Sequence, residues 1–157
     1  MNYNCKMLKL HNNHSLKEFE KEFKKIGNQI YHWQINKINK KFIDKKKFKL
    51  SADILADNLI KNIIKKYFKK DKILSEENKY NKICNNFWLI DPIDGTRSFY
   101  DNFKGFVSQA SYISYGKPIY SIIYAPALKK IWTARLGFGA FLNGKKIKFK
   151  KKNMFIK

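Results

Sequence analysis

The spacing of apolar residues changes once along this chain, and that change constrains the fold more than any other feature. Up to Phe68 the apolar side chains recur three or four residues apart, which places them on one face of a helix. From Lys72 onward they recur every second residue or in short runs, as they do in strands. Two helices followed by meandering strands predict an α+β layered domain, and 157 residues are enough for one such domain or for half of a larger one.

Two amphipathic helices are predicted in the first half of the chain. The first carries the apolar stripe of residues 16–33, with Ser15 as its N-cap and Glu18 completing a capping box. The second runs from about Ser51 to Phe68, and a lysine-rich segment over residues 40–49 links the two. Both stripes have the pattern of helices that face a core, and neither needs a functional explanation.

The second half of the chain is predicted to form strands joined by turns. Residues 87–90 are apolar throughout, which is typical of a strand buried on both faces, and this run stops at Asp91. Asn143-Gly144, between apolar segments at 141–142 and 147–149, is a strong signal for a two-residue hairpin. The remaining predicted strands are residues 73–74, 106–114, 118–124 and 130–134, with turns at 78–86 and 116–118.

The formal net charge of +22 admits two interpretations. A basic surface is typical of proteins that bind nucleic acid or anionic membranes. However, all but two of the 34 basic residues are Lys, spread along the chain among many Asn, Ile, Phe and Tyr, the residues of A/T-rich codons. Arg, which contacts phosphates in a bidentate manner, occurs only as Arg97 and Arg135. We therefore attribute the charge to genome composition and expect no nucleic-acid binding, although the field should attract anionic substrates.

The cysteines and the N-terminal segment indicate a cytoplasmic protein. Cys5 and Cys84 are far apart and have no neighbouring His cluster, which argues against a disulfide framework and against a zinc site. Residues 1–15 contain no apolar segment of the kind found in secretory leaders, and no segment reaches membrane-spanning length. We expect a cytoplasmic location, no membrane association and a reduced thiol at Cys84.

Most of the candidate chemistry follows the apolar run directly, in Asp91-Pro92-Ile93-Asp94-Gly95-Thr96. The proline fixes its own φ, so a rigid turn can aim the carboxylates of Asp91 and Asp94 and the carbonyl of Ile93 at one point. Hard oxygen ligands of this kind suit Mg²⁺. The glycine allows close approach of the backbone, and a helix that begins near the threonine would present N–H groups to a phosphate.

Glu76 and Glu77, at the end of a predicted strand, supply the carboxylate that a second cation would need. A plainer interpretation exists for each piece, because an Asp-Gly pair after a strand often forms only a turn and a Glu-Glu pair is usually solvated. Because the Glu pair and the Asp91–Thr96 segment occur in this order, and the latter follows a buried strand, they together favour a metal site.

Residues 91–99, Asp-Pro-Ile-Asp-Gly-Thr-Arg-Ser-Phe, resemble the signature of the inositol monophosphatase family, Mg²⁺-dependent and Li⁺-sensitive phosphomonoesterases related in fold to fructose-1,6-bisphosphatase. The resemblance covers the chain from about residue 16 to residue 149. It implies a layered αβαβα sugar-phosphatase fold, here only its N-terminal half, with two helices on a largely antiparallel sheet. Other segments that match in family order are Ala52-Asp53, Ile73-Leu74-Ser75-Glu76-Glu77, Gly116-Lys117-Pro118, Ile123-Tyr124-Ala125-Pro126, Thr133-Ala134 and residues 139–144.

The resemblance implies a set of metal ligands. Glu76, Asp91, Asp94 and the carbonyl of Ile93 would bind Mg²⁺, with about two or three ions in a complete site and Li⁺ as an inhibitor. Glu77 would lie beside these ligands without binding metal itself.

The resemblance also implies catalytic and phosphate-binding roles. Asp53 and Thr96, hydrogen-bonded to each other, would orient the attacking water and help to deprotonate it, with Glu76 as a further catalytic residue. The backbone amides of Gly95 and Thr96 would hold the phosphate.

Two departures from the family pattern bear on these expectations. Leu50 stands where the family usually has Thr, three residues before Asp53. The family also continues into a segment with a Trp-Asp-x-x-Ala helix start whose Asp completes the second metal site, and no Trp-Asp pair occurs here. We therefore predict an N-terminal half-domain over residues 1–149, a lysine-rich non-matching tail over residues 150–157, and no C-terminal half. A fragment of a longer enzyme, a gene product truncated by a frameshift and a genuinely short protein are three explanations that stay open.

The predicted function is Mg²⁺-dependent hydrolysis of a small sugar or polyol phosphate by a metal-activated water. Arg97-Ser98-Phe99 looks more like histidinol-phosphate phosphatases, and residues 123–126 look like 3′(2′),5′-bisphosphate nucleotidases, so both remain alternatives within the family. An alternative of another class is an inactive remnant that binds phosphate or pairs with another chain. The expected partner is a small phosphorylated metabolite, and a full-length form is expected to be a homodimer.

Overall fold

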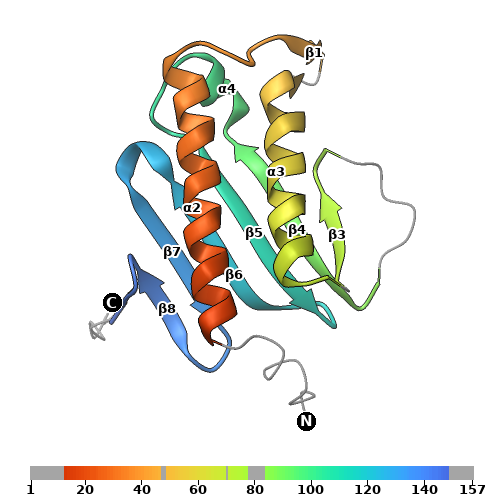
Figure 1. Cartoon of the computed structure of the whole chain (residues 1–157), viewed down its shortest axis with the longest axis vertical. Coiled ribbons are helices and arrows are strands. Elements are labelled where there is room, and N and C mark those ends of the chain that lie inside the picture. The colour runs from red at the N-terminus through yellow and green to blue at the C-terminus, as the bar shows by residue number, and fades with distance from the viewer. Residues whose placement is uncertain (1–12, 47–48, 70, 78–83, 149–157) are drawn as a thin grey trace, which may run out of the picture.

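Two helices cover one face of a seven-stranded sheet in the computed structural model of the chain (Figure 1). The structure describes residues 13–46, 49–69, 71–77 and 84–148. The long helices, α2 (Asn13–Ile35) and α3 (Ser51–Tyr67), both lie in front of the sheet in this view. The predicted α+β class, with two helices on a largely antiparallel sheet, is confirmed.

The sheet is a meander in which strand order follows chain order. Strand β3 runs parallel to β4, and every other neighbouring pair in this sheet is antiparallel. Its strands are β3 (Lys72–Ser75), β4 (Asn86–Asp94), β5 (Val107–Ser114), β6 (Lys117–Ala125), β7 (Lys130–Arg135), β8 (Gly139–Leu142) and β9 (Lys145–Lys146). The smaller elements are the hairpin of β1 (Phe42–Asp44) and β2 (Lys49–Leu50), the short helix α4 (Thr96–Tyr100) and the 3-10 turn η1 (Pro126–Leu128).

Aromatic side chains from both helices and from β4 form the centre of the core. Phe19 of α2 and Trp88 of β4 are fully buried, with ring centroids 5.3 Å apart. Phe68, which follows α3, stacks on Trp88 at 4.9 Å. Because all three rings meet between the helices and one face of the sheet, they lock α2 and α3 onto β4.

The two predicted helices are present, but the expected N-cap of the first is wrong. Helix α2 begins at Asn13, so Ser15 lies inside the helix and cannot cap its start. The apolar stripe faces the sheet as predicted, and Phe23 and Ile30 are fully buried. Helix α3 begins at Ser51 and ends one residue before Phe68, in agreement with the prediction.

The run at residues 87–90 is buried on one face only, contrary to the sequence-based expectation. Trp88 and Ile90 are almost fully buried, whereas Leu89 between them is 44% exposed. Ile123 of β6 is also exposed on the sheet, at 36%. In the part of the chain that the structure describes, α2 and α3 cover the face that carries Trp88, and the side chains on the opposite face remain accessible.

Strand β4 is longer than predicted and contains a bulge. It continues through Pro92 to Asp94, and its pairing with β5 changes register between Asp91 and Asp94. Proline is tolerated in strands at bulges, where the ladder is already interrupted. The pairing with β3 has ended at Ile90, so β4 is flanked on one side only where the proline occurs.

The remaining local predictions concern turns, the thiol and the membrane. Asn143 and Gly144 connect β8 to β9 with φ values of 48° and 77°, as a two-residue hairpin requires, although the second strand is Lys145–Lys146 instead of residues 147–149. Cys84 is a free thiol, whereas Cys5 and most of the polar stretch at 78–86 lie outside the described residues. None of the described helices combines the length and the apolar character needed to span a bilayer.

Candidate functional site

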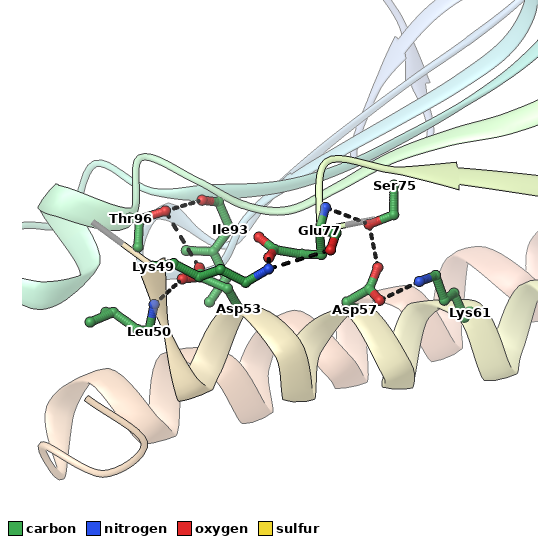
Figure 2. A network of polar contacts seen from close by, with 9 residues as sticks. All are labelled: Lys49, Leu50, Asp53, Asp57, Lys61, Ser75, Glu77, Ile93 and Thr96. Atoms are coloured by element: carbon green, nitrogen blue, oxygen red, sulfur yellow. Dashed lines mark hydrogen bonds and ion pairs between the residues drawn. The ribbon is translucent and has the colours of Figure 1, made fainter. Parts of the chain in front are cut away.

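Four segments meet where β4 leaves the sheet, and together they carry all of the sequence-predicted site residues. These segments are the bulged end of β4, the start of α4, the first turn of α3 and the turn that follows β3. Figure 2 shows Asp53 of α3 directed toward Thr96. Glu77 and Ser75, from the segment around the end of β3, lie opposite later turns of the same helix. Segments more than 40 residues apart in sequence are therefore brought to one place, since the hydrogen bond between Thr96 and Asp53 spans 43 residues.

Asp53 is held by both of its carboxylate oxygens. It is 2% exposed, and its Oδ2 accepts the backbone N–H of Leu50 at 2.6 Å. Leu50 occupies the N-cap position but has no side-chain acceptor, so only one half of a capping box exists at the start of α3. The presence of Leu50 where the family usually has Thr therefore leaves Asp53 in place. Only the hydrogen bond that a Thr side chain would make at the N-cap is lost.

The hydroxyl of Thr96 lies between two acceptors. It is 3.1 Å from the carbonyl oxygen of Ile93 and 3.4 Å from Oδ1 of Asp53. A hydroxyl has one proton, so the shorter distance favours donation to Ile93 in this state, with Asp53 as the alternative acceptor. The predicted contact between Asp53 and Thr96 is thus present, at the long end of the hydrogen-bond range.

Burial, with a smaller contribution from the negative charge of Glu77, raises the pKa of Asp53 to about 6. The hydrogen bond from Leu50 opposes this shift but does not cancel it. A carboxyl with such a pKa can exchange a proton near neutral pH, which is the property of a general base.

The carboxylates at the end of β4 form the most charged part of the site. Gln109, which faces Asp91 across the β4–β5 ladder, has its Nε2 2.9 Å from Oδ2 of Asp94 and 3.4 Å from Oδ2 of Asp91. Burial raises the pKa of Asp91 to about 7, and the negative charges of Glu76 and Asp94 contribute. Like charges this close stabilise one another's protonated form unless a cation lies between them.

This cluster has the chemistry of a divalent-cation site. Its groups are carboxylates and a backbone carbonyl, the oxygen ligands that Mg²⁺ prefers. Within the described residues, no three carboxylate, imidazole or thiol groups are already gathered at the spacing of a preformed metal centre. Burial is the main cause of the raised pKa of Asp91, and the charges of Glu76 and Asp94 add to it, so a bound cation would offset both effects.

Gly95 is required by the backbone at the start of α4. Its φ is 93°, a left-handed conformation that side chains rarely adopt, and a Cβ there would lie 3.4 Å from Cα of Phe106. The chain can therefore turn sharply from Asp94 into α4, which leaves Thr96 as the first helical residue.

Glu76 and Glu77 point to different partners. Glu76 donates its backbone N–H to the carbonyl of Ile90 at 3.2 Å, which keeps it beside β4, and its side chain interacts with Asp91. The carboxylate of Glu77 forms an ion pair with Lys49 of β2. Figure 2 shows Lys49 lying between Asp53 and Glu77.

Sequence reasoning missed four residues that the structure adds to this region. Gln109 gave no signal, because its contact with Asp91 depends on strand register. Asp57 gave a signal that was overlooked: it follows Asp53 by one helical turn and lies in the buried stripe of α3 with Ala56 and Ile60. The other additions are Ser75 and Lys61, both bound to Asp57.

Comparisons with known proteins identify the family of this chain. The model of the inositol monophosphatase family matches residues 15–155. A fructose-1,6-bisphosphatase/inositol-1-monophosphatase of Thermotoga maritima is 32% identical over 130 residues, which are 82% of this chain and 50% of that protein. The 3′(2′),5′-bisphosphate nucleotidase CysQ of Buchnera aphidicola is 40% identical over 87 residues, 53% of this chain and 33% of the relative. The chain thus spans about half the length of the curated relatives that it matches over most of its own length.

Solved structures support the same fold. The Thermotoga maritima IMPase is 28% identical with a TM-score of 0.67, covering 82% of this chain and 52% of its own. A Staphylococcal inositol monophosphatase described as a LiCl-soaked inhibitory complex is 29% identical with a TM-score of 0.60, covering 66% of this chain and 40% of its own. An IMPase/NADP phosphatase in complex with NADP and Ca²⁺ is 29% identical with a TM-score of 0.60, covering 66% of this chain and 42% of its own.

Proposed function

The chain belongs to the inositol monophosphatase family, a family of phosphatases, and from this membership we propose that it carries the metal- and phosphate-binding half of a Mg²⁺-dependent phosphomonoesterase. The substrate would be a small phosphorylated sugar or polyol. The observation that carries the proposal is that Glu76 and Asp94 lie near enough to Asp91 for their negative charges to add to the effect of burial, which raises the pKa of Asp91.

The metal ligands in this proposal are the carboxylates of Glu76, Asp91 and Asp94 and the carbonyl of Ile93. Bound Mg²⁺ would neutralise these carboxylates and the substrate phosphate and make a nearby water more acidic. Support for a divalent ion comes from the donor set and from the relative whose structure contains Ca²⁺. Support for Li⁺ as an inhibitor comes from the LiCl-soaked relative.

Asp53 and Thr96 would act on the attacking water. The Thr96 hydroxyl has Asp53 and the Ile93 carbonyl as alternative acceptors, so its oxygen could accept a proton from the water while its own proton passes to Asp53. Asp53, whose pKa is about 6, is mostly ionised at pH 7 and could therefore take up that proton. The N–H groups of Gly95 and Thr96, at the start of α4, would hold the phosphate oxygens.

A second candidate substrate is a 3′(2′),5′-bisphosphate nucleotide. The CysQ relative of Buchnera aphidicola favours it, because the 40% identity over 87 residues is higher than that of the Thermotoga relative. Both candidates use the same metal and water groups, so they differ only in what contacts the rest of the substrate.

Three further features belong to the proposal. A full-length form would be a homodimer, the protein would be cytoplasmic, and residues 1–149 would belong to an N-terminal half-domain; the predicted tail over residues 150–157 lies outside the described residues, and the family model matches up to residue 155. Sedimentation of the full-length form and fractionation of the source cells test the first two.

The proposed activity is tested by phosphate release from a panel of sugar, polyol and bisphosphate-nucleotide substrates, with Mg²⁺ and with a chelator. We expect Mg²⁺-dependent release that Li⁺ inhibits. Asp94→Asn should reduce it by roughly a hundredfold or more, because a ligand and a neutralised charge are both lost. Asp44→Asn, the same change on β1, is the matched control and should leave the rate unchanged. No release from any substrate in the panel would contradict the proposal and favour an inactive phosphate-binding remnant.

A further inference from the structure

The turn that carries Glu76 is anchored on both sides of that residue. Ser75 precedes it and is fully buried, whereas Glu77 follows it and is paired with Lys49. Figure 2 shows both anchors along α3, with Asp57 directed toward Ser75 and Lys49 directed toward Glu77. The contacts of Ser75 and Glu77 would therefore fix the backbone position of Glu76, the proposed metal ligand between them.

The Ser75 hydroxyl closes the turn. It donates a short hydrogen bond to Oδ1 of Asp57 and accepts the backbone N–H of Glu77 at 3.2 Å. Because the acceptor and the donor are two residues apart, this contact spans Glu76. The Glu76 N–H is itself bonded to Ile90, so the backbone of the turn is tied to both β4 and α3.

Asp57 can hold the Ser75 hydroxyl because its own charge is satisfied. It is 4% exposed, and its second carboxylate oxygen is paired with Lys61, four residues later on the same helix. A buried carboxylate is tolerated only when it is paired and hydrogen-bonded. The Lys61 pair and the Ser75 bond together meet that requirement, and they fix the Asp57 side chain in one orientation.

Helix α3 relates this turn to the water-activating pair. Asp53 and Asp57 are four residues apart, which separates them by about 6 Å along the helix axis and places them on one face. Asp53 contacts Thr96, and Asp57 contacts Ser75. The rigid helix therefore sets the distance between the segment that carries Thr96 and the turn that carries Glu76.

We propose that Asp57 is a positioning residue of the site, which acts through the hydroxyl of Ser75 to hold the Glu76 carboxylate in place for a divalent cation. The inference rests on the proposed function, because it takes Glu76 as a metal ligand. The Lys49–Glu77 ion pair is a second anchor on the far side of Glu76.

The test uses the full chain with two readouts. Hydrogen exchange of the metal-free protein over residues 72–77 reports the order of the turn, and calorimetric titration with Mn²⁺ reports metal affinity. Asp57→Ala, which removes the acceptor of the Ser75 hydroxyl, and Ser75→Ala should each speed exchange in this segment and weaken Mn²⁺ binding by about 10- to 100-fold, the range for residues that orient metal ligands. The double variant should be no weaker than the worse single variant, because both changes break one connection.

Two matched variants separate positioning from loss of stability. Ile60→Val removes a methyl group from the core face of the same helix without touching Asp57, and should leave Mn²⁺ affinity unchanged. Ser75→Thr keeps the hydroxyl and should restore binding relative to Ser75→Ala. If either of the two site variants fails to fold, the other one and Ser75→Thr still decide the question.

The outcomes distinguish this inference from the proposed function. Unchanged exchange, or Mn²⁺ affinity within about twofold of the parent in Asp57→Ala and Ser75→Ala, overturns the inference alone. If the variants exchange faster but the parent chain itself binds no Mn²⁺, the proposed metal site is overturned, and this inference with it. Faster exchange together with weaker binding, absent in Ile60→Val, supports the positioning role.

Discussion

Individual carboxylates in this site are arranged for a ligand at a cost to stability. Asp91 is the clearest case, because burial and the charges of Glu76 and Asp94 raise its pKa to about 7. The folded protein therefore keeps a proton on Asp91 at pH values where the unfolded chain has already lost it. Asp53 has the same direction of shift, to about 6.

The metal-free protein should become less stable as the pH rises from about 4 to about 7. Between these values the folded state binds more protons at Asp91 than the unfolded state does, so the free energy of unfolding falls with pH. Because Asp91 is only partly buried, solvent screening reduces its contribution, which is on the order of 2–4 kcal/mol for the shift to about 7. Urea unfolding at pH 5 and pH 8 with a chelator measures the difference.

Asp91→Asn is the variant that isolates this effect. It should be more stable than the parent chain at pH 8, nearly equal to it at pH 4, and unable to gain stability from Mg²⁺. The prediction would be contradicted if the free energy of unfolding of the parent chain rose between pH 5 and pH 8 and if Asp91→Asn showed the same dependence on pH.

At the residue scale, sequence predicts the groups better than it predicts what holds them. Asp53 and Thr96 were expected to be in contact, and they are 3.4 Å apart. The partners of Asp57 and Gln109 could not be predicted in the same way, because those contacts depend on how α3 and β5 register against β4. The position of Asp57 in the apolar stripe of α3 is the one sequence signal that such a partner exists, because a buried carboxylate needs one.

At the scale of elements, apolar periodicity predicts the helices and strands, whereas their ends depend on tertiary contacts. Helix α3 begins at Ser51 as expected, but α2 extends past its predicted cap at Ser15. Strand β4 continues to Asp94 because β5 still pairs with it after β3 has ended. Neither extension is encoded in the residues at the boundary.

The packing of α2 on β6 predicts an unusual effect of a helical glycine. Gly27 lies against Tyr124, and a Cβ at this position would be 2.9 Å from Cε1 of the ring and closer still to Cδ1. Gly27→Ala should therefore destabilise the protein by about 1–3 kcal/mol, although alanine normally stabilises a helix by about 1 kcal/mol over glycine. Chemical denaturation measures the change.

Asn58→Ala is the control for helix propensity, because Asn58 is an exposed position on α3. It should be neutral or slightly stabilising. A stabilised Gly27→Ala variant would mean that Tyr124 moves without cost, and its hydrogen bond to Asn28 would then be expected to break.

At the scale of the whole molecule, one face of the sheet is accessible in the described part of the chain. Leu89 and Ile123 are 44% and 36% exposed there, on neighbouring sides of β5. Exposed apolar side chains on a sheet promote self-association.

Polar substitution on this face should therefore reduce self-association of the 157-residue chain. The Leu89→Thr/Ile123→Thr double variant should shift the protein toward monomer in light scattering at matched concentration, with an unchanged far-UV spectrum. Leu55→Thr, at an exposed position on α3, is the control and should have no such effect. Equal association of the double variant and the parent chain would show that this face is not responsible.

The meander topology also has a kinetic consequence. Every strand of the large sheet pairs with its neighbour in sequence, and the antiparallel pairs from β5 to β9 can each close as a hairpin over a short loop as soon as their residues are synthesised. Helix α2 is the exception, since its Glu20 bonds to Tyr120 across 100 residues. On the ribosome, α2 is made first and can pack on α3 early, but it completes its packing only after β6 has emerged, so part of its apolar stripe stays accessible to chaperones until then.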